Sequence, residues 1–462
     1  MRKLAGRAAA RAAALARVLR NGTAGRYARG QVIEVPGAST QADWNRRLAG
    51  FLCELGDALL RAGEQTSAVE GTLSDVAARY GVRCACFVVP TGLFVRVGEG
   101  DAGVMDFRPV AGDQLRLDQV QELYGLVTRL RGRTMPIERA RAELREIHRM
   151  PRRISPAGSV LGYAILTVGL GLLQHPTSKA VLGWALLGLG VGVLRLLGAR
   201  FPVLATAMPV VAATAVTFVA LRWAEPLLHM SPGELLIPPL IAFLPGSLLT
   251  MGTIELAHGA TLSGMARLAG GVNVLLLLAF GILAGITLAD RTGLPPGIAA
   301  DGALGGWAPW AGVVLLGVGF QIFYSARARV LPWVLVCLLA ERLAQLAGTG
   351  WAGPMVGAFA AGAVIPLLAA LVERRTDTPA QVLFLPSFWM LVPGSVGLTG
   401  VSELVSGQGA SGLDDLVQTL LTMVAITLGI MVGASLLPRR RIRVSDVSPD
   451  QGAGTTTSVI SP

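Results

Sequence analysis

Two stretches of the chain share one pattern: residues 245–264 read PGSLLTMGTIELAHGATLSG, and residues 393–412 read PGSVGLTGVSELVSGQGASG. Pro-Gly-Ser, Glu-Leu and Ser-Gly recur in register, each pair 148 residues apart and without a gap. The same spacing relates two later glycines of the first copy, Gly281 and Gly285, to glycines of the second. A glycine-rich composition would not align all three groups, so the pattern indicates an internal repeat.

Both copies lie in a part of the chain that consists of long apolar runs. Hydrophobic residues make up 52% of the sequence and charged residues only 15%, against about 25% charged in soluble domains. A helix needs about 20 apolar residues to cross the hydrocarbon core of a bilayer. Ten spans are predicted, near residues 156–174, 180–198, 203–221, 235–256, 269–289, 307–325, 330–347, 352–372, 382–404 and 416–437. The fourth contains prolines, and the seventh contains Glu341 and Arg342.

Basic residues at the ends of these spans predict the orientation, because cytoplasmic loops carry an excess of arginine. With the amino terminus inside, the inner ends hold Arg152, Arg153, Arg195, Arg200, Arg267, Arg327, Arg329, Arg374, Arg375, Arg439, Arg440, Arg441 and Arg443. The outer ends hold only Lys179, Arg222, Arg291 and Arg342. This bias predicts a multi-pass protein of the cytoplasmic (cell) membrane with both termini in the cytoplasm.

The repeat divides the membrane part into two five-helix units, residues 153–290 and 304–437. Five is an odd number, so the second unit must enter the membrane from the opposite face, which gives two inverted repeats. Secondary transporters are built in this way and bind substrate where the repeats meet. Some channels also contain inverted repeats, so a channel-like permease for small solutes is an open alternative.

Residues 43–152 have the periodicity of a small soluble α+β domain. Helical spacing begins at Trp44 and stops at Gly63, while Ser67 and Glu70 predict a capping box for a second helix that ends at Gly81. Further elements are expected as strands at 84–89 and 93–97, with Phe87 and Phe94 packing together, and as helices near 116–131 and 136–149. The overall fold class is therefore an all-α polytopic membrane protein with a soluble α+β domain in front.

The two ends of the chain carry no core of their own. Residues 1–42 alternate arginine with alanine and lack the apolar run of a signal peptide. They are expected to be disordered, with a basic helix on lipid as the alternative. Residues 438–462 are a polar tail, expected in the cytosol.

The repeated Pro-Gly-Ser group is the candidate substrate site. Proline lacks an N–H group, so Pro245 should free the carbonyl of Ile241, and Pro393 that of Trp389. A broken helix offers carbonyls to a cation and N–H groups to an anion, the two charged ends of an amino acid. A packing kink with small residues is the structural alternative. The candidate substrate-binding residues are Pro245, Gly246, Ser247, Pro393, Gly394, Ser395, Asn273 and Gln321.

Glu255 and Glu403 are acidic residues that occupy the same position in both copies. A carboxylate inside a membrane is costly and often marks an ion pathway. Near the end of a span it would instead be solvated, and both residues fall close to a span end on an unbroken helix. These two residues are the candidates for proton coupling.

Other classes of function lack their motifs. The net charge is +11, but no nucleic-acid-binding pattern is present. The four histidines and four cysteines are not spaced as metal ligands, and no catalytic group, cofactor or ATP-binding motif is expected. Homo-oligomerisation is left open.

The chain resembles the bacterial threonine/serine exporter family over residues 43–437. The resemblance rests on short motifs in both parts, namely Gly56, Leu59-Leu60, Gly63, Thr66, Val69-Glu70, Tyr80-Gly81, Pro90-Thr91-Gly92, Pro245-Gly246-Ser247, Glu255-Leu256, Ser263-Gly264, Arg267-Leu268, Phe384-Leu385-Pro386-Ser387 and Leu391-Val392-Pro393-Gly394-Ser395-Val396-Gly397. It implies a ten-span protein that exports L-threonine and L-serine with the proton gradient.

Members of this family are also described as carrying hydrolase-like motifs in the soluble domain. A membrane-embedded hydrolase is therefore a further alternative. Here Thr66, Ser67 and Glu70 are interpreted as helix-capping residues, because no histidine lies nearby in the sequence to activate a nucleophile.

Overall fold

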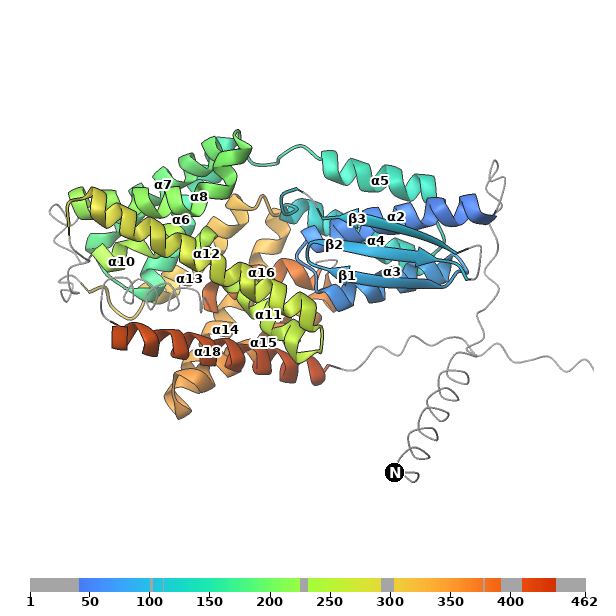
Figure 1. The fold of residues 1–462 in the computed structure, drawn as a ribbon. Coiled ribbons are helices and arrows are strands. Elements are labelled where there is room, and N and C mark those ends of the chain that lie inside the picture. The colour runs from blue at the N-terminus through green and yellow to red at the C-terminus, as the bar shows by residue number, and fades with distance from the viewer. Residues whose placement is uncertain are drawn as a thin grey trace, which may run out of the picture.

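The computed structural model describes residues 41–99, 103–110, 112–224, 232–291, 303–376, 379–391 and 409–437. The expectations for segment 1–40 and for the tail 438–462 lie outside these residues. Figure 1 shows two parts, a small domain with a sheet and a larger all-helical part.

The small domain is a three-stranded antiparallel sheet with helices packed on one face. Its elements are α2 (Gln41–Arg61), α3 (Thr66–Arg79), β1 (Cys84–Val89), β2 (Gly92–Val97), β3 (Val104–Pro109), α4 (Leu117–Gly132) and α5 (Ile137–Arg149). The strand order is β1-β2-β3, and α2 and α3 contact the sheet. Gly63 and Gly81 follow α2 and α3 with φ values of 85° and 76°, which confirms the expected helix stops.

The third strand was not expected from the sequence. Its side chains lie mostly at the surface, so it lacks the apolar alternation of a half-buried strand. Phe94 faces Phe87 on one side and Phe107 on the other, with ring centroids 6.4 and 4.5 Å apart. The expected aromatic pair is therefore part of a row of three exposed rings on the outer face of the sheet.

The second part consists of helices from Pro156 onward. In order they are α6 (Pro156–Gln174), α7 (Ser178–Gly198), α8 (Pro202–Val219), the π-helix η2 (Ala220–Ala224), α10 (Pro232–Leu236), the 3-10 helix η3 (Pro238–Phe243), α11 (Gly246–Ala257), α12 (Thr261–Leu288), α13 (Ala308–Phe323), η4 (Ala328–Val330), α14 (Leu331–Ala352), α15 (Pro354–Arg375), α16 (Ala380–Leu391) and α18 (Gly409–Ser435).

Helical segments occur at the positions of all ten predicted spans. Six are long and apolar enough to cross a membrane: α6, α7, α12, α14 with η4, α15 and the Val417–Ser435 part of α18. Three other positions hold shorter or broken helices, and the ninth is described only as far as Leu391 of α16, so ten crossings stay a prediction. One boundary was wrong: α14 continues to Ala352 instead of ending at 347, which places Arg342 near its middle and not at an outer end.

Helices at equivalent places in the two copies pack through repeat-related glycines. Gly285 of α12 lies against the backbone of Thr214 in α8, and Gly433 of α18 lies against the backbone of Ala363 in α15. A Cβ at either glycine would collide with its neighbour, so small residues are needed there. The two helix pairs α8–α12 and α15–α18 are thus held together in the same way.

The two copies meet most extensively along α6 and α13. Gly169 of α6 and Gly312 of α13 lie against each other's backbones, and Gly319 lies against the backbone of Leu166. This close contact brings the first helix of each copy together in the interior.

Candidate functional site

The fourth predicted span is broken at its prolines. It consists of α10, η3 and α11, and α11 begins at Gly246 directly after Pro245. The expectation of a free carbonyl at Ile241 is wrong, because this oxygen accepts a hydrogen bond from the N–H of Leu244 at 3.1 Å. Pro245 has no N–H to donate to this carbonyl, and a 3-10 turn supplies the N–H of Leu244 instead. The break therefore offers the N-terminus of α11, whose first N–H groups have no partner within the helix.

Two aromatic side chains hold the segment before this break. The hydroxyl of Tyr163 in α6 donates to the carbonyl of Pro239 at 2.7 Å and accepts from the N–H of Ala242 at 3.4 Å. The indole N–H of Trp184 in α7 donates to the carbonyl of Glu234 at 3.1 Å. These bonds fix the broken span to its own copy of the repeat.

Arg195 of α7 brings a positive charge to the same region. Its guanidinium carbon lies 5.1 Å from the ring centre of Phe243, two residues before Pro245. The rings of Phe323 in α13 and Tyr163 lie 5.2 and 6.0 Å away. These distances are typical of cation–π contacts. In the sequence Arg195 was only one of several basic residues at span ends.

Helix α11 belongs to the first copy of the repeat and lies at its contact with the second copy. Pro245 and Gly246 are buried and Ser247 is half-buried. Further along α11, Ile254 joins a buried apolar cluster with residues of α15, α16 and α18, namely Ala358, Ala361, Ile365, Phe388, Leu391, Ile426 and Ile430. The broken helix of the first copy thus packs against three helices of the second. Pro393, Gly394, Ser395 and Glu403 lie outside the described residues.

The two polar candidates outside the Pro-Gly-Ser motif have different environments. Gln321 of α13 is half-buried, and its Oε1 atom is buried without a hydrogen-bond partner among the described residues. Asn273 is exposed on α12, beside exposed Val272 and Leu276. Only Gln321 is therefore directed toward the protein interior.

Glu255 lies at the end of α11, in contact with the small domain. Its side chain is 1% exposed, and Arg267 of α12 donates to Oε2 at 3.0 Å. The backbone N–H and the hydroxyl of Thr66 both donate to Oε1, at 3.1 and 3.2 Å. Arg267 also donates to the carbonyl of Glu64 at 3.1 Å. This candidate for proton coupling is thus a fully bonded carboxylate at a domain contact.

The capping interpretation of the motif around Thr66 is wrong. Residue Gln65 occupies the N-cap position of α3, and no side chain caps this helix. Thr66 donates to Glu255, and the Glu70 carboxylate accepts from the N–H of Val88 at 3.0 Å. Val88 in turn accepts a bond from Ser263 of α12 at 3.5 Å. Both polar residues serve the connection between β1, α3 and the membrane part.

The second copy of the repeat also contacts the small domain. Arg327, between α13 and η4, forms an ion pair with Glu122 of α4. Glu255, Ser263 and Arg267 flank the α11–α12 loop, and Arg327 lies in the α13–α14 loop. Both are predicted inner loops. The α6–α7 and α12–α13 connections, which are predicted outer loops, instead pair with each other between Thr177 and Ala303.

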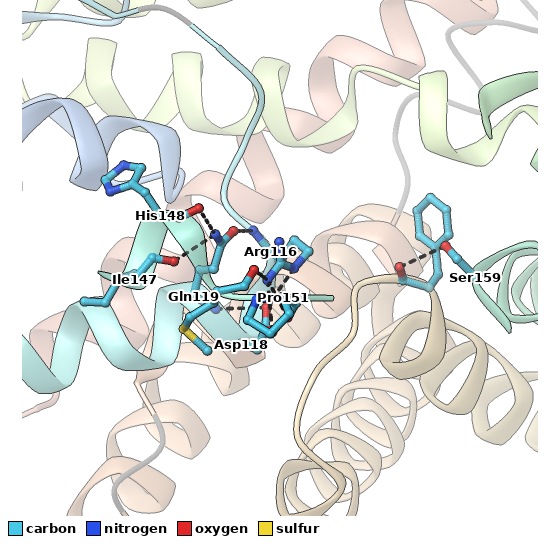
Figure 2. Close-up of polar contacts among 9 residues, drawn as sticks. Arg116, Asp118, Gln119, Ile147, His148, Pro151 and Ser159 are labelled. Carbon is cyan, nitrogen blue, oxygen red and sulfur yellow. Dashed lines mark hydrogen bonds and ion pairs between the residues drawn. The ribbon is translucent and has the colours of Figure 1, made fainter. Parts of the chain in front are cut away.

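The chain between the two parts is fixed by α4 (Figure 2). Arg116 donates to the carbonyl of Met150 at 2.9 Å, and Gln119 donates to that of Ile147 at 3.0 Å. Buried Asp118 accepts from Arg116 at 3.1 Å and keeps its guanidinium in place. These bonds fix the end of α5 and Met150, where the connection to α6 begins.

Glu341 is a buried acid that the sequence analysis did not select. It lies in the middle of α14 and is 0% exposed. Neither carboxyl oxygen has a hydrogen-bond partner among the described residues. A single acid in a long apolar run was the available signal, but the span was expected to end soon after it.

Comparison with known families agrees with this architecture. A family model described as putative threonine/serine exporter matches residues 50–289, and a second, described as threonine/serine exporter, ThrE, matches residues 311–436. The first match joins the small domain to the first copy of the repeat. No curated protein and no solved structure matches the chain. The chain is thus a multi-pass membrane protein that belongs to the threonine/serine exporter family of amino-acid exporters.

Proposed function

We propose that the chain exports small neutral hydroxy amino acids, L-threonine and L-serine, from the cytoplasm by alternating access, in exchange for protons. In this proposal it spans the cell membrane ten times with both termini in the cytoplasm. The two five-helix copies are inverted and move relative to each other around the substrate.

One observation carries this proposal. Helix α11 begins at a proline break inside the membrane part and packs against α15, α16 and α18 of the other copy. A helix start between two moving units is suited to bind an anionic group, because its N–H groups and dipole favour negative charge. Arg195 adds a positive charge to the segment before the break, through its contact with Phe243.

The substrate is an amino acid whose carboxylate faces the start of α11 at Gly246 and Ser247. The Ser247 hydroxyl would bond to a polar group of the substrate, and Gln321 offers a buried oxygen without a partner among the described residues. The equivalent group of the second copy, Pro393, Gly394 and Ser395, would complete the site from the opposite side. Glu403 stays a candidate for proton coupling.

For Glu255 we propose a docking role. Its carboxylate accepts from three donors, two of Thr66 and one of Arg267. Exposing this carboxylate to water would therefore require breaking the contact between the small domain and the membrane part. In this proposal the small domain lies in the cytoplasm and contacts both copies, at Glu255 and Arg267 of the first and at Arg327 of the second.

Exchange of labelled threonine in proteoliposomes tests the function. The wild-type protein should catalyse saturable exchange that unlabelled serine competes for. Ser247→Ala should raise the KM about tenfold, since one hydrogen bond of about 1.4 kcal/mol corresponds to that factor. The matched control is Ser435→Ala, which removes an exposed hydroxyl that bonds within its own turn.

Two outcomes would contradict the proposal. Vesicles without saturable threonine exchange would reject the exporter assignment, and an ionic conductance would instead indicate a channel. An unchanged KM in Ser247→Ala would remove the helix break from the binding site.

A further inference from the structure

We propose that Glu341 is the residue that binds the proton which drives export. This inference rests on the proposed proton-coupled transport and names its coupling site. It is independent of Glu255 and Glu403, the two acids that the repeat singles out.

The first argument is position. Helix α14 has 22 residues, and Glu341 is preceded by ten of them and followed by eleven. With a rise of 1.5 Å per residue, the carboxyl group lies about 15 Å from either end of the helix. That is the middle of a hydrocarbon core about 30 Å thick, where an acidic residue is rare and generally functional.

The second argument is that no counterion of Glu341 is present among the described residues. Arg342, the next residue, donates to Gln345 at 2.8 Å and forms no ion pair with Glu341. Both oxygens of Glu341 are unpartnered in the described part of the chain. The undescribed segments between residues 41 and 437 contain no lysine or arginine, and one histidine, His229.

A hydroxyl and a thiol are the polar groups that the structure places near the carboxyl group. The hydroxyl of Ser387 on α16 lies beside it, and this buried hydroxyl also lacks a partner within the described residues. Cys337, one turn earlier on α14, is the titratable neighbour. A buried ionised carboxylate without a partner costs several kcal/mol, so this conformation holds the neutral acid.

Glu341 is stable in this conformation only as the neutral acid. To lose its proton it must reach a second conformation in which the carboxylate contacts water. Helix α14 packs against α15 and α16, and α16 also contacts α11 of the other copy. Both α14 and α16 belong to the second copy, so the α14–α16 contact would open to water if α11 draws α16 away from α14 when the first copy moves. The acid would then release its proton to water on the cytoplasmic side, and the carboxylate would take one from water on the outer side.

A proton fits this site better than the substrate ammonium group. The side chain is fully enclosed, and a proton requires no added volume. An ammonium group would need a cavity large enough for the rest of the amino acid.

The experiment compares coupled transport with exchange in the same vesicles. Threonine is present at equal concentration on both sides, and the interior is one pH unit more acidic. Antiport of one proton should accumulate threonine inside up to about tenfold, because one pH unit corresponds to about 1.36 kcal/mol. Glu341→Gln should abolish accumulation and keep threonine exchange. Glu373→Gln is the control, because this acid lies exposed at the end of α15.

A second variant separates coupling from folding. Glu341→Asp keeps an acid and should retain accumulation, with a shifted pH profile. Normal accumulation in Glu341→Gln would overturn the inference, and so would loss of both exchange and accumulation in both variants. Absence of exchange in the wild type would contradict the proposed function itself.

Discussion

Glu255 and Glu341 are both buried acids in the helical part, but their surroundings are opposite. Glu255 is at the end of a helix, where Arg267 and two donors of Thr66 satisfy it. Glu341 is in the middle of a helix and has no partner among the described residues. Burial alone therefore does not identify an ion-carrying residue, since the number of donors around the acid determines which form is stable.

The comparison assigns the two acids to different tasks. A carboxylate with a fixed cation and fixed donors gives a specific contact, because it binds in one geometry. An acid without a partner is stable only when neutral, so that its protonation changes when its environment changes. The first suits the docking of the small domain, and the second suits proton transfer.

The largest effect is expected from removing the cation of Glu255. Arg267→Met should lower the free energy of unfolding by about 3–5 kcal/mol, because it leaves a buried carboxylate without its ion-pair partner. Denaturant unfolding in detergent, followed by tryptophan fluorescence, measures this change. Arg329→Met, at an exposed position in η4, is the control. A change within about 0.5 kcal/mol, as for an ordinary surface substitution, would contradict the docking role.

Removing the acid at Glu341 is expected to change the free energy of unfolding in the opposite direction. Glu341→Leu should raise the free energy of unfolding by about 2 kcal/mol, since it removes a buried polar group that has no bond to lose. The same unfolding experiment measures it. A loss of stability comparable to that of Arg267→Met would mean that Glu341 has a partner, and the contrast between the two acids would fail.

A smaller effect is expected at Thr66, which keeps its backbone donor when the hydroxyl is removed. Thr66→Val should cost about 1.5 kcal/mol, the lower end of the range for a hydrogen bond to a charged group. Thr128→Val is matched to it, because that exposed hydroxyl bonds to the carbonyl of Tyr124 in its own helix. Equal stability of the two variants would show that the Thr66 hydroxyl contributes nothing to docking.

The outline of the membrane part could be predicted because it depends on local properties. The apolar run from Pro156 predicted α6 with both ends correct, and Ser155 caps it by accepting from the N–H of Gly158. The break before Gly246 followed from the missing N–H of proline. The exporter family followed from motifs that occur in both parts, and the family models bear it out.

The partners of polar residues could not be predicted in this way. Thr66, Ser67 and Glu70 fit a capping box by spacing, but Thr66 bonds to a carboxylate 189 residues away. Strand β3 was missed because its exposed side chains give no apolar alternation.

The sequence by itself determined where helices form and where one breaks, because hydrophobicity and the chemistry of proline act over a few residues. It also determined the repeat, whose equivalent glycines pack equivalent helix pairs. Only the tertiary structure decided which of two acids is paired, because Arg267 and Thr66 come from different elements and meet Glu255 only when the small domain docks. Glu341 has no cation beside it among the described residues, and the Ser387 hydroxyl of α16 lies close to its carboxyl group without a hydrogen bond of good geometry.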